Sequence, residues 1–250
     1  LRALGTLRCG RGPSRGPPVL SKPSRTADLA SPPSSPDRAL VIGLTGAPAA
    51  GKSAAARAFA EAGCAVVDVD ALGHAVLDTP DVRARVTALF GPEVLGPDGR
   101  IDRAALARRV FPDPAALSRL ERVVHPVVRL RVASDVEAAR RLSPRAVVLD
   151  CALLFEGPLT ALCDTTVCVE AERAERERRA AARGWPVGEL PRREARQLSP
   201  EEKRARADHV LANDDRPETL VRSVRALLDL LIPIHDSAAA ADDEDPSDDR

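Results

Sequence analysis

Short apolar runs alternate with stretches of helical periodicity along the central part of the chain. Nearly continuous apolar runs, typical of buried strands, occupy 39–46, 64–70, 146–155, 165–171 and 207–214. Residues 52–62 and 218–231 instead place apolar side chains three and four positions apart, which predicts amphipathic helices. Strands without alternation are buried on both faces, as in parallel sheets covered by helices. The pattern therefore predicts an α/β fold in which helices flank a five-stranded parallel sheet.

Two segments interrupt this alternation. The stretch 71–142 has helical spacing and no strong strand, and it is too long for a single crossover connection. The stretch 171–206 carries eleven cations and seven acids, a net charge of +4, and Trp185-Pro186 divides it into two helical patterns. We therefore expect a helical insertion at 71–142 and a lid of two short helices at 171–206.

The arginines of the predicted lid follow a helical period. Arg176, Arg179 and Arg183 fall on one face of its first helix. The second helix carries three more arginines, at 192, 193 and 196. Such cations could meet the charge of a triphosphate when a lid closes. The alternative is a solvated surface face on which Glu172 and Glu175 neutralise the arginines.

Both ends of the chain have the composition of disordered segments. Residues 1–38 are rich in Pro, Ser, Gly and Arg and carry seven cations against two acids, a net charge of +5. A targeting sequence and a non-native extension are open alternatives for this segment. Residues 235–250 carry a net charge of −6. We expect 1–38 and 233–250 to be disordered, and one folded domain to occupy 39–232.

Charge and cysteine content limit the functional classes. Lys+Arg and Asp+Glu both number 37, and a net charge of zero disfavours a large nucleic-acid footprint. No apolar run approaches the roughly 18 residues of a membrane helix. The five cysteines include no C-x-x-C pair and do not cluster with histidine, so we expect no zinc site and a reducing, cytoplasmic location. Arginine supplies 34 of the 37 cations, so the lysines at 22, 52 and 203 stand out.

Residues 46–53, GAPAAGKS, match the pattern G-x-x-x-x-G-K-[ST] between a predicted strand and a predicted helix. In this phosphate loop, backbone N–H groups and the helix N-terminus cradle phosphates. Lys52 would contact the β- and γ-phosphates of ATP, and Ser53 would bind Mg²⁺. We expect Lys52 to be an exposed ammonium that adds little to stability. The expected ATP-binding residues are Gly46, Ala49, Ala50, Gly51, Lys52, Ser53 and Ala54.

Two aspartates follow predicted strands at the edge where parallel sheets bind ligands. Asp70 ends the second strand, where a carboxylate could accept or orient the proton of an acceptor hydroxyl. Asp68 shares its face by the period of two and is a weaker candidate. Asp70 could instead cap the next helix. Asp150 ends the third strand and could hold Mg²⁺ through water, or act only as a cap.

Other classes of nucleotide-binding protein lack support. A GTPase would read its base with N-K-x-D, but the only lysine after the loop, Lys203, follows Glu202. The glutamate-rich Walker B sequence of a motor ATPase is absent as well. The sequence therefore predicts nucleoside triphosphate binding, but the phosphate loop alone does not identify the reaction.

The chain resembles the dephospho-coenzyme A kinase family over about 39–232. The segments that carry the resemblance are IGLTGAPAAGKS, GCAVVDVDALGHAVL, ALFGPEVLGPDGRIDRAALARRVFPDP, RLERVVHPVV, VVLDCALLFEGPLTALCDTTVCVEA and RREARQLSPEEKRARADHVLAN. The family loop usually reads G-G-I-G-S-G-K-S-T, so 47–50 and Ala54 depart from it. Ala152 stands where the family has proline, and Trp185 where its R-D-G sequence ends.

The resemblance implies a P-loop kinase fold with a nucleotide core, a helical acceptor-binding insertion and a lid. The implied reaction moves the γ-phosphate of ATP, with Mg²⁺, to the 3′-hydroxyl of dephospho-coenzyme A. Asp70 would be the base, Lys52 would steady the phosphates, and Arg179 and Arg183 would be lid charges. His125-Pro126 and Asp102-Arg103 lie in the insertion and would help to shape the acceptor site, although His125 could simply be a packing residue.

Two alternatives remain at this stage. The first is another small-molecule P-loop kinase, such as a nucleoside monophosphate kinase. The second is a non-catalytic, arginine-rich nucleic-acid binder, against which stand the neutral charge and the scarcity of stacking aromatics. The expected partner is a small-molecule substrate, with no nucleic acid and no membrane, and the expected state is a monomer.

Overall fold

The computed structural model describes residues 20–21, 39–214 and 216–232. Its strands form one sheet in the spatial order β1-β6-β5-β2-β4-β3. Their bounds are β1 Leu20–Ser21, β2 Leu40–Gly46, β3 Ala65–Asp68, β4 Ala146–Asp150, β5 Thr165–Glu170 and β6 His209–Ala212. Strands β2 to β6 pair in parallel, which confirms the five-stranded parallel sheet that the apolar runs predict.

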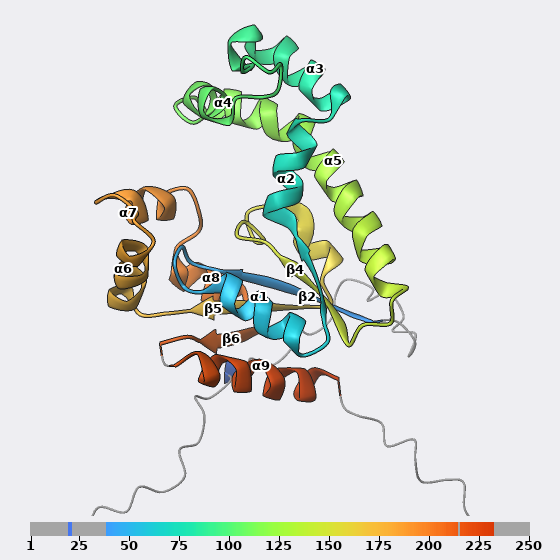
Figure 1. Cartoon of the computed structure of the whole chain (residues 1–250), viewed down its shortest axis with the longest axis vertical. Helices are drawn as coiled ribbons and strands as arrows, with labels where there is room; N and C mark the ends of the chain where they lie inside the picture. Colours follow the sequence, from blue (N-terminus) through green and yellow to red (C-terminus); the bar gives the residue numbers. More distant parts are fainter. Residues whose placement is uncertain (1–19, 22–38, 215, 233–250) are drawn as a thin grey trace, which may run out of the picture.

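Helices cover both faces of the sheet (Figure 1). They are α1 Lys52–Glu61, α2 Val69–Leu77, α3 Pro80–Phe90, α4 Arg103–Val110, α5 Pro114–Arg140, α6 Arg173–Ala182, α7 Glu189–Glu194, α8 Pro200–Arg206 and α9 Pro217–Leu231, with short 3₁₀ turns at η1 Pro92–Val94 and η2 Pro158–Leu162. Helices α1 and α9 pack together on one face. Helix α5 and η2 cover the other face.

Strand β2 lies between β4 and β5 and therefore has no free edge, and helices cover both of its faces. Ile42 and Leu44 pack toward α1 and α9, whereas Val41 packs toward α5. All three side chains are fully buried. This double coverage explains why the strand sequence is continuously apolar instead of alternating.

Helices α2 to α5, residues 69–140, form an arm that projects from the sheet (Figure 1). The arm has its own apolar core, which includes Val82, Val86, Phe90 and Leu106. Helix α5 spans 27 residues with Pro126 inside it, and its C-terminal part returns to the sheet through Val132 and Val136. Helices therefore occupy the 71–142 stretch in which the spacing predicts them. No described helix is long and apolar enough to cross a membrane.

Strand β1 lies within the 1–38 segment that the composition predicts to be disordered. Leu20 and Ser21 pair antiparallel with Val210 and His209 at the open edge of β6, so the prediction is wrong for these two residues. A sheet edge presents unpaired N–H and C=O groups, and even a polar, proline-rich segment can satisfy them. The remainder of 1–38, and 233–250, lie outside the described residues.

We expect a chain trimmed to 39–234 to keep its turnover within about threefold of that of the full chain. Within the described residues, trimming removes the two-residue pairing of β1 with β6, which contributes about 1–2 kcal/mol. Steady-state kinetics and thermal melting of the two chains would test this. A loss of turnover with an unchanged melting temperature would show that a terminal segment takes part in catalysis.

Candidate functional site

The phosphate loop, residues 46–53, connects the central strand β2 to helix α1. Its two glycines meet steric constraints. A Cβ on Gly46 would lie 2.6 Å from the Val169 carbonyl oxygen of β5, and a Cβ on Gly51 would lie 2.0 Å from Asn213 Nδ2. Gly51 also has a φ of 102°, a conformation that favours glycine. Only glycine therefore allows the loop to pack this closely against the ends of β5 and β6.

The alanines of the loop are buried. Ala49 adopts a φ of 63°, which is unusual for a residue with a Cβ, and its methyl packs against Ala180 and Leu190 of the lid. The Ala50 N–H closes a turn to the Ala47 carbonyl, 3.0 Å away. The first N–H groups of α1 point out of the helix end without helical acceptors, as at every helix N-terminus. The loop thus presents donors to a phosphate despite its unusual sequence.

The clash at Gly51 predicts a stability difference between two glycine variants. Gly99, in the arm, also has a positive φ, but its added Cβ would meet nothing within 4 Å. We expect Gly99→Ala to cost about 1 kcal/mol of backbone strain. Gly51→Ala should lower the melting temperature at least twice as much, because it also displaces Asn213. Equal melting shifts for the two variants would contradict the steric argument.

Lys52 lies between two carboxylates. Its Nζ is 3.1 Å from Asp70 Oδ2 and 2.7 Å from Asp150 Oδ1. Its side chain is 16% exposed, so the expectation of an exposed ammonium is wrong. Burial alone would lower the pKa of Lys52, but the charges of Asp150 and Asp70 outweigh it and raise the pKa above its ordinary value. Lys52 therefore stays charged at neutral pH.

Asp150 ends β4 beside the phosphate loop. Burial raises the pKa of its carboxyl group against the opposing effect of Lys52. Its Oδ1 is buried and pairs with the Lys52 ammonium 2.7 Å away, which leaves a second lone pair on that oxygen. The site thus holds a buried oxygen acceptor with spare capacity next to the loop.

The sequence pattern predicts that Asp70 ends a strand, but in the structure it does not. Strand β3 ends at Asp68, whose carboxylate accepts a hydrogen bond from the Ala71 N–H and caps α2. Because helix α2 starts directly after the strand, Asp70 lies in its first turn. There its Oδ1 accepts a bond of 3.4 Å from the Ala152 N–H while its Oδ2 faces Lys52. The cap is therefore Asp68, and Asp70 is the carboxylate that faces the loop.

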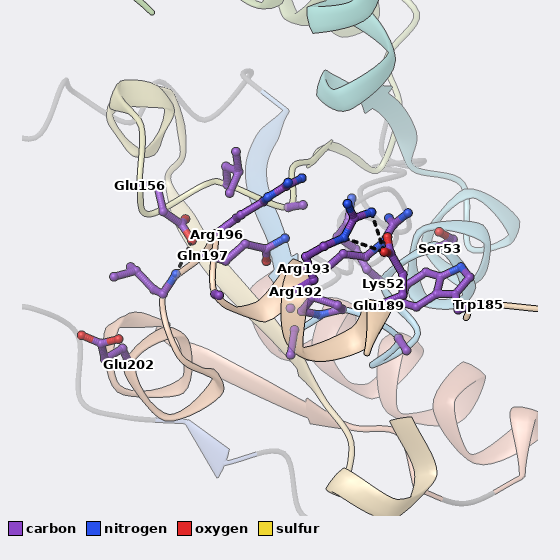
Figure 2. A pocket seen from close by; sticks show the side chains of 18 of the residues that line it. Lys52, Ser53, Glu156, Trp185, Glu189, Arg192, Arg193, Arg196, Gln197 and Glu202 are labelled. Atoms are coloured by element: carbon purple, nitrogen blue, oxygen red, sulfur yellow. Dashed lines mark hydrogen bonds and ion pairs between the residues drawn. The ribbon is translucent and has the colours of Figure 1, made fainter. Parts of the chain in front are cut away.

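A cleft of about 1060 Å³ opens over the phosphate loop and is bounded by the arm and the lid. Figure 2 shows its labelled side chains, with Lys52 and Ser53 near Trp185 and the lid arginines. The arm contributes residues that lie far from the loop in sequence: His74, Phe111, Leu117 and Glu121. The lid, residues 171–206, contains three helices instead of two, because Arg196 and Gln197 lie beyond α7 and Ser199 caps α8.

The three arginines of the predicted lid face have different partners. Arg176 is buried and binds the Ala171 carbonyl and Glu194. Arg179 donates to the Ala50 carbonyl of the phosphate loop at 3.0 Å and to the Asn213 carbonyl at 2.7 Å. Arg183 lines the cleft beside the Trp185 ring. In this arrangement Arg179 supports the loop from outside the cleft, and Arg183 lies where a ligand would bind.

Several contacts in and around the cleft are absent from the sequence-based prediction of the site. The Arg196 guanidinium lies 4.1 Å from the centre of the Phe111 ring, so it links the lid to the arm. No described carboxylate lies within ion-pair distance of Arg196 or Arg183. Asn213 donates to the Ala50 carbonyl at 2.8 Å. The scarcity of aromatic residues is the one sequence signal that could have drawn attention to Phe111 and Trp185.

The insertion residues that the resemblance suggests for the acceptor site lie outside this cleft. His125 and Pro126 line a separate, smaller cavity on α5, together with Arg122 and Arg129. Asp102 caps α4 by accepting hydrogen bonds from the Ala104 and Ala105 N–H groups. Their proposed part in acceptor binding stays a prediction.

The comparisons with known proteins agree on one family. The family model described as dephospho-CoA kinase matches residues 40–218. The dephospho-CoA kinase of Deinococcus radiodurans is 43% identical over 197 residues, which cover 78% of this chain and 94% of the relative. That of Anaeromyxobacter dehalogenans is 43% identical over 194 residues, covering 76% and 92%.

Solved structures show the same fold. The protein TT1252 from Thermus thermophilus is 39% identical, with a TM-score of 0.68 over 78% of this chain and 98% of that one. The dephospho-CoA kinase from Campylobacter jejuni is 20% identical, with a TM-score of 0.58 over 77% and 96%. The chain has a complete phosphate loop and paired carboxylates, and both the family model and the relatives match most of its length. It therefore belongs to the dephospho-CoA kinase family.

Proposed function

We propose that the cleft above the phosphate loop transfers the γ-phosphate of ATP to the 3′-hydroxyl of dephospho-coenzyme A. The observation that carries the proposal is the Lys52 ammonium between Asp70 and Asp150 at the end of the loop. One cation and two carboxylates are thereby placed where phosphoryl transfer needs phosphate neutralisation, metal binding and proton acceptance. The reaction yields coenzyme A and ADP.

Bound ATP would replace some of the contacts that the side chains of the site make with one another. The loop N–H groups and the N-terminus of α1 hold the phosphates, and Ser53 and Ala54 lie in the first turn of that helix. Lys52 then turns from the carboxylates to the β- and γ-phosphate oxygens. Arg183, and with it Arg196, supplies lid charge to the transferred group, because neither has a described carboxylate partner.

Asp70 would accept the proton of the acceptor hydroxyl or orient that hydroxyl toward the γ-phosphate. Its side chain is 43% exposed and contacts Lys52, which lines the cleft, so an acceptor bound beside Lys52 would lie close to Asp70. The Ala152 N–H holds its other oxygen. Because the transition state is loose, orientation contributes more than the strength of the base.

Mg²⁺ fits the side chains beside the loop. Asp150 has a buried carboxylate oxygen whose partner is the Lys52 ammonium, and Ser53 lies at the start of α1, the next residue after Lys52. The described residues contain no cluster of three or more His, Cys, Asp or Glu for a metal. Mg²⁺ needs few protein ligands, since one or two oxygens complete a sphere of water and phosphate. Bound there, it would neutralise developing charge on the phosphates.

The arm, residues 69–140, would bind the acceptor, and the lid would close over ATP. The cleft surface of the arm, which includes His74, Phe111 and Glu121, faces the phosphate loop across the cavity. A coupled assay of ADP release with ATP and either dephospho-coenzyme A or nucleoside monophosphates tests this assignment. We expect turnover with dephospho-coenzyme A alone. Faster turnover with a monophosphate would favour the alternative kinase.

A reducing compartment, the cytoplasm, is the proposed location. The four described cysteines are free thiols, and Cys64, Cys151 and Cys168 are buried. Burial raises the pKa of Cys151, Cys163 and Cys168 to about 12, so these thiols stay protonated. We further propose that the enzyme acts as a monomer on small-molecule substrates, without nucleic acid or membrane.

A further inference from the structure

Lys203 is a buried cation that the mechanism above does not use. It lies in α8 with no solvent exposure. The chain has only three lysines among 37 cations, and Lys203 and Lys52 are the two within the described residues. A buried ammonium is strongly destabilising unless it is paired and hydrogen-bonded. A lysine retained at such a position in an arginine-rich chain therefore indicates a specific requirement for that side chain.

The Lys203 ammonium has three acceptors, which match its three donors. Its Nζ lies 2.5 Å from the Ala152 carbonyl oxygen, 2.8 Å from Gln197 Oε1 and 3.3 Å from Glu156 Oε1. Burial lowers the pKa of Lys203, and the charge of Glu156 opposes this effect. The planar, five-donor guanidinium of arginine would not fit three convergent acceptors in a closed site.

These acceptors belong to two parts of the cleft wall. Ala152 and Glu156 lie in the β4 loop, residues 151–156, directly after the Asp150 carboxylate. Gln197 lies in the connection between α7 and α8, at the base of the lid, where the Leu198 N–H also donates to Glu156 Oε1 at 2.9 Å. Lys203 therefore ties the lid base to the β4 loop.

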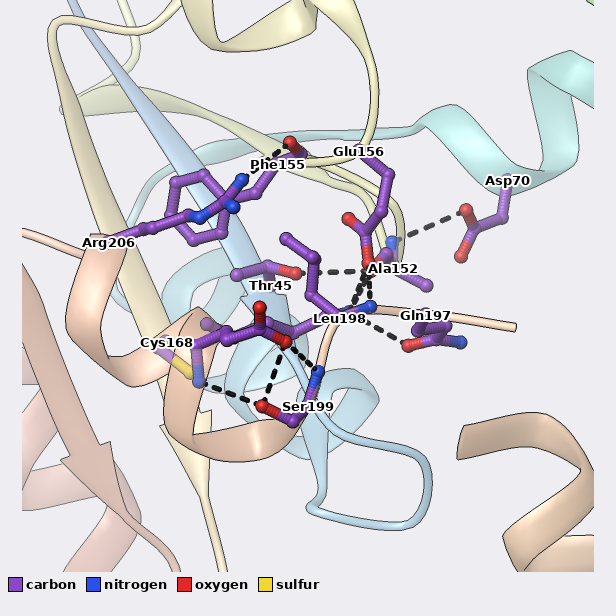
Figure 3. A network of polar contacts seen from close by, with 12 residues as sticks. Thr45, Asp70, Ala152, Phe155, Glu156, Cys168, Gln197, Leu198, Ser199 and Arg206 are labelled. Carbon is purple, nitrogen blue, oxygen red and sulfur yellow. Dashed lines mark hydrogen bonds and ion pairs between the residues drawn. The ribbon is translucent and has the colours of Figure 1, made fainter. Parts of the chain in front are cut away.

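Ala152 is the point at which this network meets the proposed base. Its N–H donates to Asp70 Oδ1 at 3.4 Å, and its carbonyl accepts from both Lys203 and Thr45 Oγ1, the latter at 3.2 Å. Figure 3 shows Ala152 between Thr45 and Asp70, with Glu156, Gln197 and Leu198 beside it. Both backbone groups of Ala152 are thus engaged, and a shift of its carbonyl would move the N–H that holds Asp70.

We propose that Lys203 is a positioning residue for phosphoryl transfer, which acts by fixing Ala152, and through it Asp70, while it anchors the base of the lid. The inference rests on the proposed role of Asp70. Lys203 does not contact a substrate. Displacement of a reacting group by about 1 Å can cost on the order of 100-fold in rate, so a positioning residue can have a large catalytic effect.

The test compares kinetics with stability in a set of variants. Lys203→Met removes the ammonium at similar length, and Lys203→Met/Glu156→Gln also removes the carboxylate that would be left unpaired. Glu156→Gln alone is measured as the reference for the double variant. Arg204→Met is the matched control, because Arg204 is the next residue of α8, is exposed and forms an ion pair with Glu170 of β5. Trp185, the single tryptophan, lines the cleft and reports ATP binding by its fluorescence.

We expect Lys203→Met to lower kcat by about tenfold or more, with an ATP dissociation constant within about threefold of the wild-type value. The double variant should recover melting temperature but keep a kcat well below that of Glu156→Gln. Arg204→Met should have ordinary kcat. Recovery of the melting temperature without recovery of kcat is the result expected of a positioning residue. If the role of Lys203 were purely structural, the double variant would recover both quantities.

Two results would overturn the proposal. One is a kcat of Lys203→Met within about threefold of the wild-type value. The other is a double variant whose kcat returns to that of Glu156→Gln together with its melting temperature. If Lys203→Met alone does not fold, the double variant decides the question at low temperature. The turnovers of the wild-type chain and of Asp70→Asn, measured in parallel, test the proposed function separately. An active Asp70→Asn enzyme would refute the role of Asp70 as the base, whatever the Lys203 variants show.

Discussion

Replacement of Lys52 by alanine is expected to reduce turnover by at least about 100-fold, the scale of removing an electrostatic donor from a transition state. Lys52 lies between the phosphate loop and both carboxylates, at 3.1 Å from Asp70 and 2.7 Å from Asp150. Without it, the γ-phosphate would face two acidic groups and would lose the cation that lies closest to both of them. Steady-state kinetics at saturating ATP and dephospho-coenzyme A would measure the loss.

The same substitution should also lower the melting temperature. The Asp150 carboxyl is 10% exposed and would lose the ammonium that offsets its burial, so its pKa would rise further. Arg57→Ala is the matched control, because it removes an exposed cation from the same helix, away from the cleft. Wild-type turnover in Lys52→Ala would refute the assignment of the site, and a loss of equal size in Arg57→Ala would show that helix α1 had been disturbed.

Asp70→Asn is expected to lower kcat strongly while ATP affinity changes little. The asparagine amide cannot accept the acceptor proton, whereas the triphosphate is held by loop N–H groups and Lys52. Removal of a negative charge near the γ-phosphate could only favour ATP. The measurements are kcat at saturating substrates and the dissociation constant of ATP from Trp185 fluorescence.

Asp68→Asn provides the control for Asp70. Asp68 is the N-cap of α2, and asparagine caps a helix nearly as well as aspartate, so stability and kcat should hardly change. A fall in kcat of less than about threefold in Asp70→Asn, below about 1 kcal/mol of barrier, would exclude a catalytic role for Asp70. A large loss in Asp68→Asn alone would transfer that role to Asp68.

Local sequence predicts the sheet and the phosphate loop because both depend on interactions between near neighbours. Strand β2 and helix α1 begin and end within one residue of their predicted limits, since a buried strand must be apolar and the turn between them needs glycine at 46 and 51. The β3 boundary was less predictable. The pattern extends the strand to Asp70, but the Asp68 cap starts a helix two residues earlier.

The contacts that long side chains make could not be predicted in the same way. Arg176, Arg179 and Arg183 share a helical face in sequence, yet one joins α6 to α7, one binds the phosphate loop and one lines the cleft. Helical periodicity gives the direction of a side chain but not the element that it meets. The edge strand β1 is a similar case, because its pairing with β6 depends on a distant sheet edge.

The sequence alone determined the fold class, the family resemblance and the residues of the phosphate loop, because each follows from the order of residue types along the chain. Only the tertiary structure decided that Asp70 and Asp150 share Lys52, that the arm faces the lid across one cleft, and that Lys203 is buried beneath the β4 loop. The contact of Lys52 with Asp70 joins residues 18 positions apart, and that of Lys203 with Ala152 joins residues 51 positions apart. The physical reason is that the packing of helices on the sheet sets the burial of these side chains and the distances between them. A local sequence pattern does not determine that packing.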